Sequence, residues 1–395
     1  MTSFEQDYSY KFEKSSDQYP MAAQEAIFDI EPLFAKRSER LEEINKVAPA
    51  EADFAKLTTL TNKALWDRYY TGDAIRPNQS FYSSLSDRNQ KLSAWDMGQV
   101  LEATLSTDKL NDDRSRSDEL NKDLNVMGNF WDQRSKPPAY SSMYGPSGDK
   151  YYDDNSWIGI AMVDSFRQFH NKSDLYRATQ VHEFNEHGTR GTEKLAHPGG
   201  VLWTQQKDNL YRATVSTAGA TQLALELYQE TRDQKYLDFA QKQHDWVNAN
   251  LRDSNGLYYD GMDADGKLHK EQYTYNQGLM LGNAALLYKA TGDEKYLKEA
   301  QEIAGIAVKN FAGGTYPEPF KEQLLFFNAV FFKNLCLLDE IAPDASYKKV
   351  LGDYARILAP KVDAQTGLIK DDGKMTLLDQ TSAIQIFALA QKHAG

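Results

Sequence analysis

The sequence has very little cysteine and no long apolar segment. One cysteine, Cys336, occurs in 395 residues, so an intrachain disulfide is excluded and the fold does not depend on an oxidising compartment. Cys336 lies in an apolar stretch and is expected to be buried. No apolar run reaches membrane length, and the first residues lack the apolar core of a signal peptide. We therefore expect a soluble, cytoplasmic protein that does not span a membrane.

Clusters of positive charge are also absent. The net charge is −12 and no long Lys/Arg run occurs, which argues against a nucleic acid or an anionic membrane surface as partner. The seven histidines include no His-Glu-x-x-His pair, and no nucleophile elbow, phosphate loop or dinucleotide fingerprint is present. We expect no metal and no cofactor, and a neutral partner such as a carbohydrate fits the charge. The oligomeric state is not predicted.

Strands with alternating hydrophobicity are scarce, and helical periodicity dominates. Residues 1–50 are expected to form an N-terminal segment with one helix that packs on the remainder, and residues 51–395 one helical domain. The predicted helices start near the following residues: Met21, Asp53, Ala94, Asp118, Ser156, Asp174, Thr217, Gln234, Gln277, Glu294, Phe320, Ser346 and Leu378.

An internal repeat supports this organisation. Three stretches each show the pattern of an apolar helix, a tight polar turn and a second helix, and each second helix has a tyrosine near its start. These tyrosines, Tyr176, Tyr236 and Tyr296, recur at intervals of 60 residues. We expect each tyrosine to pack between helices, which is a structural role.

Connections alternate between short and long, and the long ones cover roughly residues 134–155, 188–213 and 251–275. Helical hairpins with this alternation place all long connections on one face. Six hairpins closed into a ring make an (α/α)6 barrel, which is the predicted fold class. An open solenoid of helix pairs is the structural alternative.

Two adjacent aspartates, Asp153 and Asp154, lie between aromatic residues where a long connection leads into a helix. Two carboxyls can divide the work of cleaving a glycosidic bond, since one attacks or stabilises positive charge while the other carries a proton. The alternative is that one of them only caps the helix. The repeat places Thr214 and Thr274 at 60-residue steps from Asp154, so these positions should share one face. The pairs at 112–113 and 371–372 have no place in the repeat and are expected to lie in surface turns.

Several neighbours of this face could bind a sugar. Aromatic rings serve as platforms for sugar rings, and side-chain amides donate to and accept from hydroxyls. The alternatives are an ordinary core position for Trp203 and helix capping for the amides. The candidate substrate-binding residues are Tyr152, Trp157, Trp203, Thr274, Tyr275, Asn276 and Gln277.

At these residues the chain resembles glycoside hydrolase family 76, the endo-α-1,6-mannanases and their relatives. The likeness rests on residues 152–154 with Trp157, on residues 199–203 (GGVLW) and on residues 274–278 (TYNQG), with a fainter echo at 327–335. It extends over roughly residues 66–387. The resemblance implies an (α/α)6 barrel that cleaves α-mannosidic bonds with retention, in which Asp153 is the nucleophile and Asp154 the acid/base. Retention places the two carboxyls about 5–5.5 Å apart.

The chain departs from the family pattern at residues 212–217 (RATVST), where the family often has Lys-Asn-x-Ile-Ser-Asn. If the two lost asparagines contact sugar, the substrate is not a plain α-1,6-mannan, and a short oligosaccharide is expected. A sugar epimerase is a second hypothesis. Its histidine bases would be His182, His187 or His244, but these residues are predicted on the outer helices, away from a cleft. A noncatalytic carbohydrate-binding helical-repeat protein is a third reading.

Overall fold

The computed structural model describes residues 52–70, 92–110, 115–145, 148–312, 319–370 and 376–394. The chain divides into compact units of residues 1–47 and 48–395, and all described residues belong to the second unit. The predicted N-terminal segment with its helix therefore lies outside the described residues. The same holds for both aspartate pairs that were predicted to lie in surface turns.

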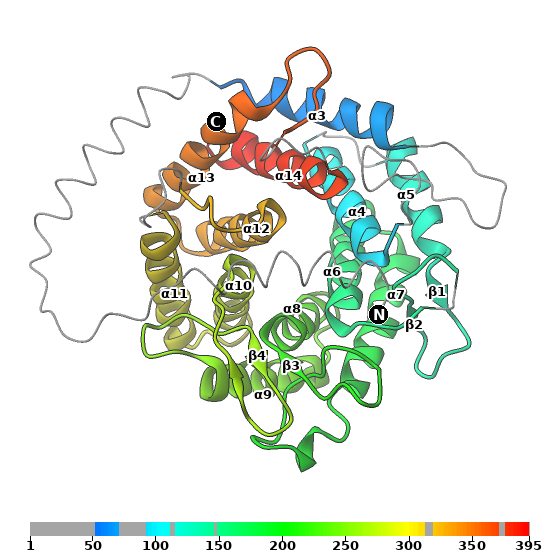
Figure 1. Ribbon diagram of the computed structural model, residues 1–395, viewed down its shortest axis with the longest axis vertical. Helices are drawn as coiled ribbons and strands as arrows, with labels where there is room; N and C mark the ends of the chain where they lie inside the picture. The colour runs from blue at the N-terminus through cyan, green and yellow to red at the C-terminus, as the bar shows by residue number, and fades with distance from the viewer. Residues whose placement is uncertain are drawn as a thin grey trace, which may run out of the picture. The chain divides into compact units, whose positions relative to one another are not determined.

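The described residues form an inner and an outer set of helices, drawn in Figure 1 as two concentric rings. The inner helices are α4 (Ala94–Asp108), α6 (Tyr152–Phe169), α8 (Thr214–Thr231), α10 (Thr274–Thr291), α12 (Leu325–Ile341) and α14 (Leu377–His393). The outer helices are α3 (Phe54–Tyr69), α5 (Asp118–Gly128), α7 (Lys172–His187), α9 (Gln234–Leu251), α11 (Glu294–Ala312) and α13 (Ala345–Leu358).

The inner helices close on themselves. Each packs against the next in the order α4, α6, α8, α10, α12, α14, and α14 returns to α4 (Figure 1). The outer helix α3 packs mainly against α14, so the first described helix and the last make one pair across the chain's length. The predicted closed (α/α)6 barrel is confirmed, and the open solenoid is excluded.

Two small sheets and two short 3-10 helices lie in the connections that the structure describes. Antiparallel β1 (Trp131–Asp132) and β2 (Ala139–Tyr140) lie between α5 and α6, and η2 (Ala359–Lys361) follows α13. The second sheet has the order β3-β4-β5 and joins two long connections. Its strands are β3 (Arg212–Ala213), β4 (Gly261–Met262) and β5 (Leu268–His269), and η1 (Thr192–Lys194) precedes it.

The short turns of the repeat form as predicted. The inner helices α6, α8 and α10 end at His170, Arg232 and Gly292, each of which adopts a left-handed backbone conformation. The N–H of each of these residues bonds to a carbonyl of the last helical turn, which satisfies the helix end. The next residue, such as Asn171 or Asp233, caps the outer helix with its side chain.

The repeat tyrosines do not all pack as expected. Tyr236 and Tyr296 are buried and contact the rings of His182 and His244 on the preceding outer helix. The prediction is wrong for Tyr176, which is 65% exposed. The outer helix before it is the short α5, which has 11 residues and no histidine for the ring to contact.

The inner helices α6, α8 and α10 begin three or four residues before the predicted starts. Their cap residues, Tyr151, Ala213 and Tyr273, make no side-chain hydrogen bond to the helix. The sequence therefore carries no capping signal at the true start. As a result Asp153, Asp154, Thr214 and Thr274 lie in first helical turns rather than in the loops.

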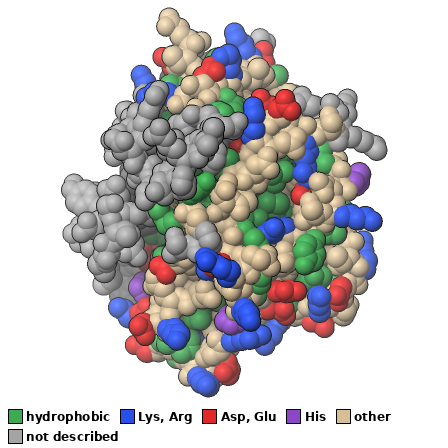
Figure 2. All heavy atoms as spheres, turned by 90° about the vertical axis from the view of Figure 1, so that its right-hand side faces the viewer, with side chains coloured by type: hydrophobic (Ala, Val, Ile, Leu, Met, Phe, Trp, Pro, Cys, Tyr) green, Lys and Arg blue, Asp and Glu red, His purple; other side chains and the backbone are tan. Residues whose placement is uncertain are grey.

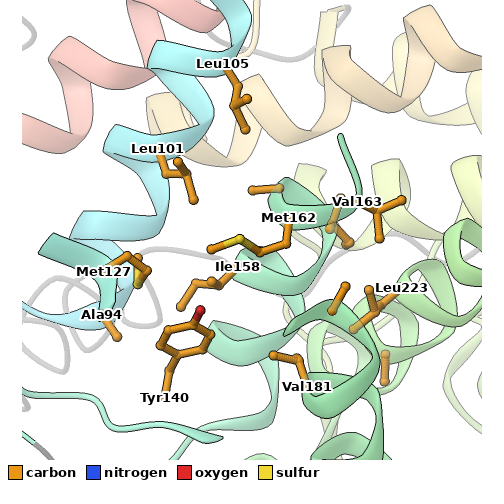
Figure 3. Packing of buried hydrophobic residues seen from close by; sticks show 14 of the residues in the cluster. Ala94, Leu101, Leu105, Met127, Tyr140, Ile158, Met162, Val163, Val181 and Leu223 are labelled. Carbon is orange, nitrogen blue, oxygen red and sulfur yellow. The ribbon is translucent and has the colours of Figure 1, made fainter. Parts of the chain in front are cut away.

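A buried apolar cluster holds α6 between its neighbours. In Figure 3, Ile158 and Met162 of α6 lie toward Leu101 of α4, and the cluster continues to Leu223 of α8. Gly159 allows this close approach, because a Cβ there would lie 2.6 Å from a methyl group of Leu223. Burying one such large apolar side chain stabilises a fold by about 1.5–3 kcal/mol. The helix that carries the aspartate pair is therefore fixed from several sides.

On the face drawn in Figure 2, acidic and basic side chains are interspersed among the coloured residues. Cys336 is buried as expected, and burial raises the pKa of its thiol to about 12. In the described part of the chain, no helix is both long and apolar enough to cross a membrane.

Candidate active site

Asp153 and Asp154 lie in the first turn of the inner helix α6, and the cap of this helix is Tyr151. The side chain of Asp153 accepts the backbone N–H of Asp154 at 3.0 Å, which satisfies one free donor of the helix start. Both carboxyls remain partly open to solvent although dense protein surrounds them. A helix N-terminus favours negative charge, so this position suits a carboxylate that must ionise.

The Asp153 carboxylate has a second donor from a different loop. The indole Nε1–H of Trp203 donates to Asp153 Oδ2 at 3.0 Å. Burial raises the pKa of Asp153 to about 6, while the two hydrogen bonds act in the opposite direction and the charge of Asp260 adds to the rise. Asp153 is thus ionised at neutral pH with its charge directed toward two N–H groups.

The pKa of Asp154 is raised well above its usual value. Burial is the largest cause, and the negative charges of Asp153 and Asp96 follow. Like charges in a confined site cannot all ionise, so Asp154 keeps its proton once Asp153 has lost its own. The pair therefore combines an ionised carboxylate with a protonated carboxyl.

Asp260 belongs to the site and was not predicted from the sequence. Its carboxylate accepts the hydroxyl of Tyr211 at 2.7 Å and that of Tyr275 at 3.3 Å. Burial raises the pKa of Asp260, and the bonds from the two tyrosine hydroxyls act in the opposite direction. One sequence signal was available, because residues 258–260 repeat the Tyr-Tyr-Asp pattern of residues 151–153.

Asp96 is a second residue that sequence analysis missed. It lies in the first turn of α4, where it forms a capping box with Ser93. Its carboxylate accepts both the N–H and the hydroxyl of Ser93, and its pKa is raised by burial. Because α4 packs against α6, this charge acts on Asp154 from the neighbouring inner helix.

Aromatic rings surround the carboxyls at this end of the ring. Trp157 contacts Trp95 of α4, and the latter contacts Phe326 of α12. Across the site, Trp203 packs against Tyr151 and Tyr211. The predicted residues Trp157 and Trp203 thus present half-buried rings next to Asp153 and Asp154.

The other predicted binding residues are more deeply buried. Tyr152 stacks on Phe184 of the outer helix α7 and is 2% exposed, so its ring packs between the two helices. Thr274 donates to Asn328 at 2.9 Å. Gln277 bonds to the backbone N–H and C=O of Tyr258. These side chains are occupied by protein partners, whereas Tyr275 reaches the site through Asp260.

The segment 199–203 is shaped by two glycines. Gly199 and Gly200 have φ of 116° and 78°, and a Cβ on either would lie 2.7 Å from the ring of Trp246. Arg212, fully buried, donates to the carbonyls of Ala196, His197 and Gly199. The loop that ends at Trp203 is therefore held against α9 before it reaches Asp153.

A cavity of about 20 Å³ is lined by Trp157, by Glu102 of α4 and by Lys333 of α12. This volume suits about one water molecule and excludes a sugar ring. The carboxyls themselves lie at the end of the ring where the inner helices begin.

No cluster of metal ligands occurs among the residues that the structure describes. The histidines considered for an epimerase lie on outer helices, as the sequence predicted: His182 and His187 on α7, His244 on α9. His182 is 1% exposed, and burial lowers its pKa to about 3. None of the three is among the groups that shift the pKa values of Asp153 and Asp154.

Curated proteins and solved structures are similar to this chain. A mannan endo-1,6-alpha-mannosidase (DCW1) of Saccharomyces cerevisiae is 31% identical over 222 residues, which cover 52% of this chain and 46% of the yeast protein. The chain spans about half the length of the curated relatives it matches.

Solved structures share the fold. A GH76 alpha-mannanase of Bacteroides thetaiotaomicron superposes with a TM-score of 0.74 at 21% identity, covering 86% of this chain and 96% of that one. An alpha-1,6-mannanase of Salegentibacter superposes with a TM-score of 0.71 at 19% identity, covering 86% and 99%. That protein was solved with alpha-1,6-mannotriose, as an inactive variant in which two adjacent aspartates are replaced by asparagine.

The family model described as glycosyl hydrolase family 76 matches residues 54–383, which include the described helices from α3 to α13 in whole and the first turns of α14. The chain belongs to glycosyl hydrolase family 76.

Proposed function

We propose that this chain hydrolyses α-1,6-mannosidic bonds of an oligo- or polysaccharide by a retaining double displacement. The observation that carries the proposal is the adjacent pair Asp153 and Asp154, whose surroundings give the two carboxyls different proton affinities. The curated relatives are named mannan endo-1,6-alpha-mannosidases, and a structural relative is inactive without two adjacent aspartates. Both facts support this substrate class and this pair.

In the first step Asp153 attacks the anomeric carbon and Asp154 protonates the leaving glycosidic oxygen. The bond from carbon to the leaving oxygen breaks, and a glycosyl-enzyme ester on Asp153 forms. Asp154, now ionised, accepts a proton from water, which attacks the same carbon and releases Asp153. The Asp154 N–H and the Trp203 indole stabilise the Asp153 carboxylate that leaves.

Aromatic rings and a third carboxylate are suited to hold the sugar. Trp203 and Trp157 offer half-buried ring faces on either side of the pair. Asp260 is fixed by the hydroxyls of Tyr211 and Tyr275, and its remaining acceptor capacity is available to sugar hydroxyls. A neutral glycan needs such polar contacts rather than a charged surface.

The test replaces each aspartate separately. Asp153→Asn and Asp154→Asn are expected to reduce hydrolysis of α-1,6-linked mannooligosaccharides by at least 10³-fold, since each removes one half of the double displacement. Asp149→Asn, an exposed change in the preceding loop, is the control and should retain activity. Full activity in either site variant would overturn the assignment.

Stereochemistry and folding complete the test. Proton NMR of the first product of the unmodified protein should show the α-anomer, whereas the β-anomer would indicate inversion. Both site variants should fold, and thermal melting checks this, because asparagine matches aspartate in shape and its side-chain oxygen can still accept the N–H groups of residue 154 and Trp203. Stable binding of mannooligosaccharides without any turnover in the unmodified protein would instead favour a noncatalytic binding protein. The cytoplasmic location stays a prediction.

A further inference from the structure

In the described residues, the connections before α6, α8, α10, α12 and α14 are each bonded to the inner helix that follows. Four residues after the cap of α6, Asn155 binds both the N–H and the C=O of Tyr140, and Gln277 of α10 does the same for Tyr258. Asn328 of α12 bonds to the C=O of Phe320. Gln380 of α14 accepts the N–H of residue 369. We call the fourth residue after the cap of an inner helix the loop clamp, because its side chain bonds to the backbone of the preceding connection in α6, α10, α12 and α14.

In α8 the clamp position is Thr217. Its hydroxyl accepts the N–H of Val201 at 3.0 Å, and the hydroxyl of Ser216 donates to the C=O of Val201 at 3.0 Å. Two hydroxyls thus supply the donor and the acceptor that a single amide supplies in α6 and α10. Thr217 and Val201 are both fully buried, so this pairing is not shared with solvent.

The clamped residue has a constant relation to the site. Trp203, which donates to Asp153, follows Val201 by two residues. Asp260, whose charge acts on Asp153, follows the clamped Tyr258 by two residues. The clamps of α8 and α10 therefore each position one side chain that acts on the Asp153 carboxylate.

We propose that Thr217 is a positioning residue for Asp153, acting through Val201 and the Trp203 indole, and not a contact to sugar. The inference rests on the proposed function, because it assigns Asp153 as the nucleophile. It also changes the meaning of the departure at residues 212–217. A threonine where the family often has asparagine keeps the clamp, so this position does not select the glycan.

The test uses the isosteric change Thr217→Val with a control one turn further along α8. Thr221 is also fully buried, but its hydroxyl bonds only to the C=O of Thr217 in its own helix. Thr217→Val removes the acceptor for the Val201 N–H, which loosens the loop and weakens the Trp203 bond to ionised Asp153. The acid limb of kcat/KM against pH should move upward by about 0.5 pH unit, with kcat reduced more than KM is raised.

Thr221→Val should leave the acid limb in place, and Thr217→Ser, which keeps the hydroxyl, should match the unmodified protein. Thr217→Val added to Trp203→Phe should cause no further shift, because the donor is already gone. Asp154 on α6, Asp260 before β4 and Tyr275 on α10 face Asp153 and are unchanged in all variants.

A second measurement needs no substrate. The ¹⁵N indole signal of Trp203, identified by its loss in Trp203→Phe, should titrate with Asp153, and its midpoint should rise by the same amount in Thr217→Val. This readout decides the inference even if mannooligosaccharides are not cleaved. Unchanged midpoints in Thr217→Val would overturn the proposal, and a raised KM with an unchanged acid limb would indicate a sugar contact instead. Thr217→Ala gives the same decision if the valine variant does not fold.

Discussion

Asp153 and Asp154 are neighbours in the chain, yet their carboxyls meet different surroundings. The Asp153 carboxylate receives two N–H donors, one from the helix start and one from Trp203, and these oppose the effect of burial. The Asp154 carboxyl lies between the charges of Asp153 and Asp96, which add to the effect of burial. Hydrogen bonding to the charged form lowers a pKa and a like charge raises it, so the first group ionises before the second.

This difference predicts the pH dependence of kcat/KM. Activity should rise as the pH increases through about 6, where Asp153 loses its proton, and fall at higher pH as Asp154 loses its own. Trp203→Phe should move the rising limb to higher pH, because the carboxylate loses a donor. Trp131→Phe, whose indole donates to Gln133 in another loop, should leave it in place. A rising limb near the ordinary aspartate pKa of about 4 would contradict this account.

At the scale of elements, the connection between α7 and α8 is a rigid arm rather than a free loop. Arg212 and the Trp246 indole hold its carbonyls, and Gly199 and Gly200 pass directly over the Trp246 ring. Trp203 follows at the end of this arm, where its backbone C=O accepts the N–H of Tyr152. The donor to Asp153 is therefore positioned by contacts with β3, α9 and the start of α6.

Gly200→Ala should disturb this arm. The residue has φ of 78°, and its new Cβ would lie 2.7 Å from the Trp246 ring. Gly191→Ala is a matched control in the same connection, with φ of 87° and no atom within 4 Å of the new Cβ. Both changes should lower the free energy of unfolding by about 1–3 kcal/mol for the backbone strain. Only Gly200→Ala should also lower kcat/KM, by about tenfold, and equal kinetics of the two variants would contradict the role of the arm.

Most of the helices could be predicted from the sequence, but few of the contacts between them could. Apolar periodicity and the 60-residue interval predicted the helices and the closed ring, because both depend on local pattern. The first turns of α6, α8 and α10 were missed, since Tyr151, Ala213 and Tyr273 give no capping signal. The clamp role of Gln277 and the approach of Asp260 to Asp153 were missed because they join distant connections, which no local pattern records.

At the scale of the whole ring, the two ends of the inner helices differ in chemistry. The end where the helices begin carries the carboxyls and aromatic rings of the site. Toward the other end, Lys333 of α12 donates to Glu102 of α4 at 2.8 Å and to Asp164 of α6 at 3.0 Å. Lys109 and Arg167 also pair with Asp164 and hold its pKa far below the usual range. Through Lys333 these charges link α12 to α4 and α6, which are not its neighbours in the ring.

Lys333→Met should therefore destabilise the ring. It leaves the carboxylates of Glu102 and Asp164, each 12% exposed, without their shared cation, and such a loss costs about 3 kcal/mol of unfolding free energy at pH 7. Lys392→Met is a matched control, because Lys392 pairs with Glu340 at the same 2.8 Å and joins α14 to α12, but both side chains are at least half exposed. That change should cost at most about 1 kcal/mol.

The pH dependence of this cost has a definite sign. The depressed pKa of Asp164 stabilises the fold above the unfolded aspartate pKa of about 4, and this contribution disappears as the pH falls through the folded pKa. Lys333 contributes to the depressed pKa of Asp164, so the gap between Lys333→Met and the unmodified protein should narrow as the pH falls below about 4. Urea unfolding at several pH values measures this gap. Equal costs for the two lysine variants at pH 7 would contradict the prediction, because the partly buried pairs of Lys333 would then add no more stability than an exposed pair.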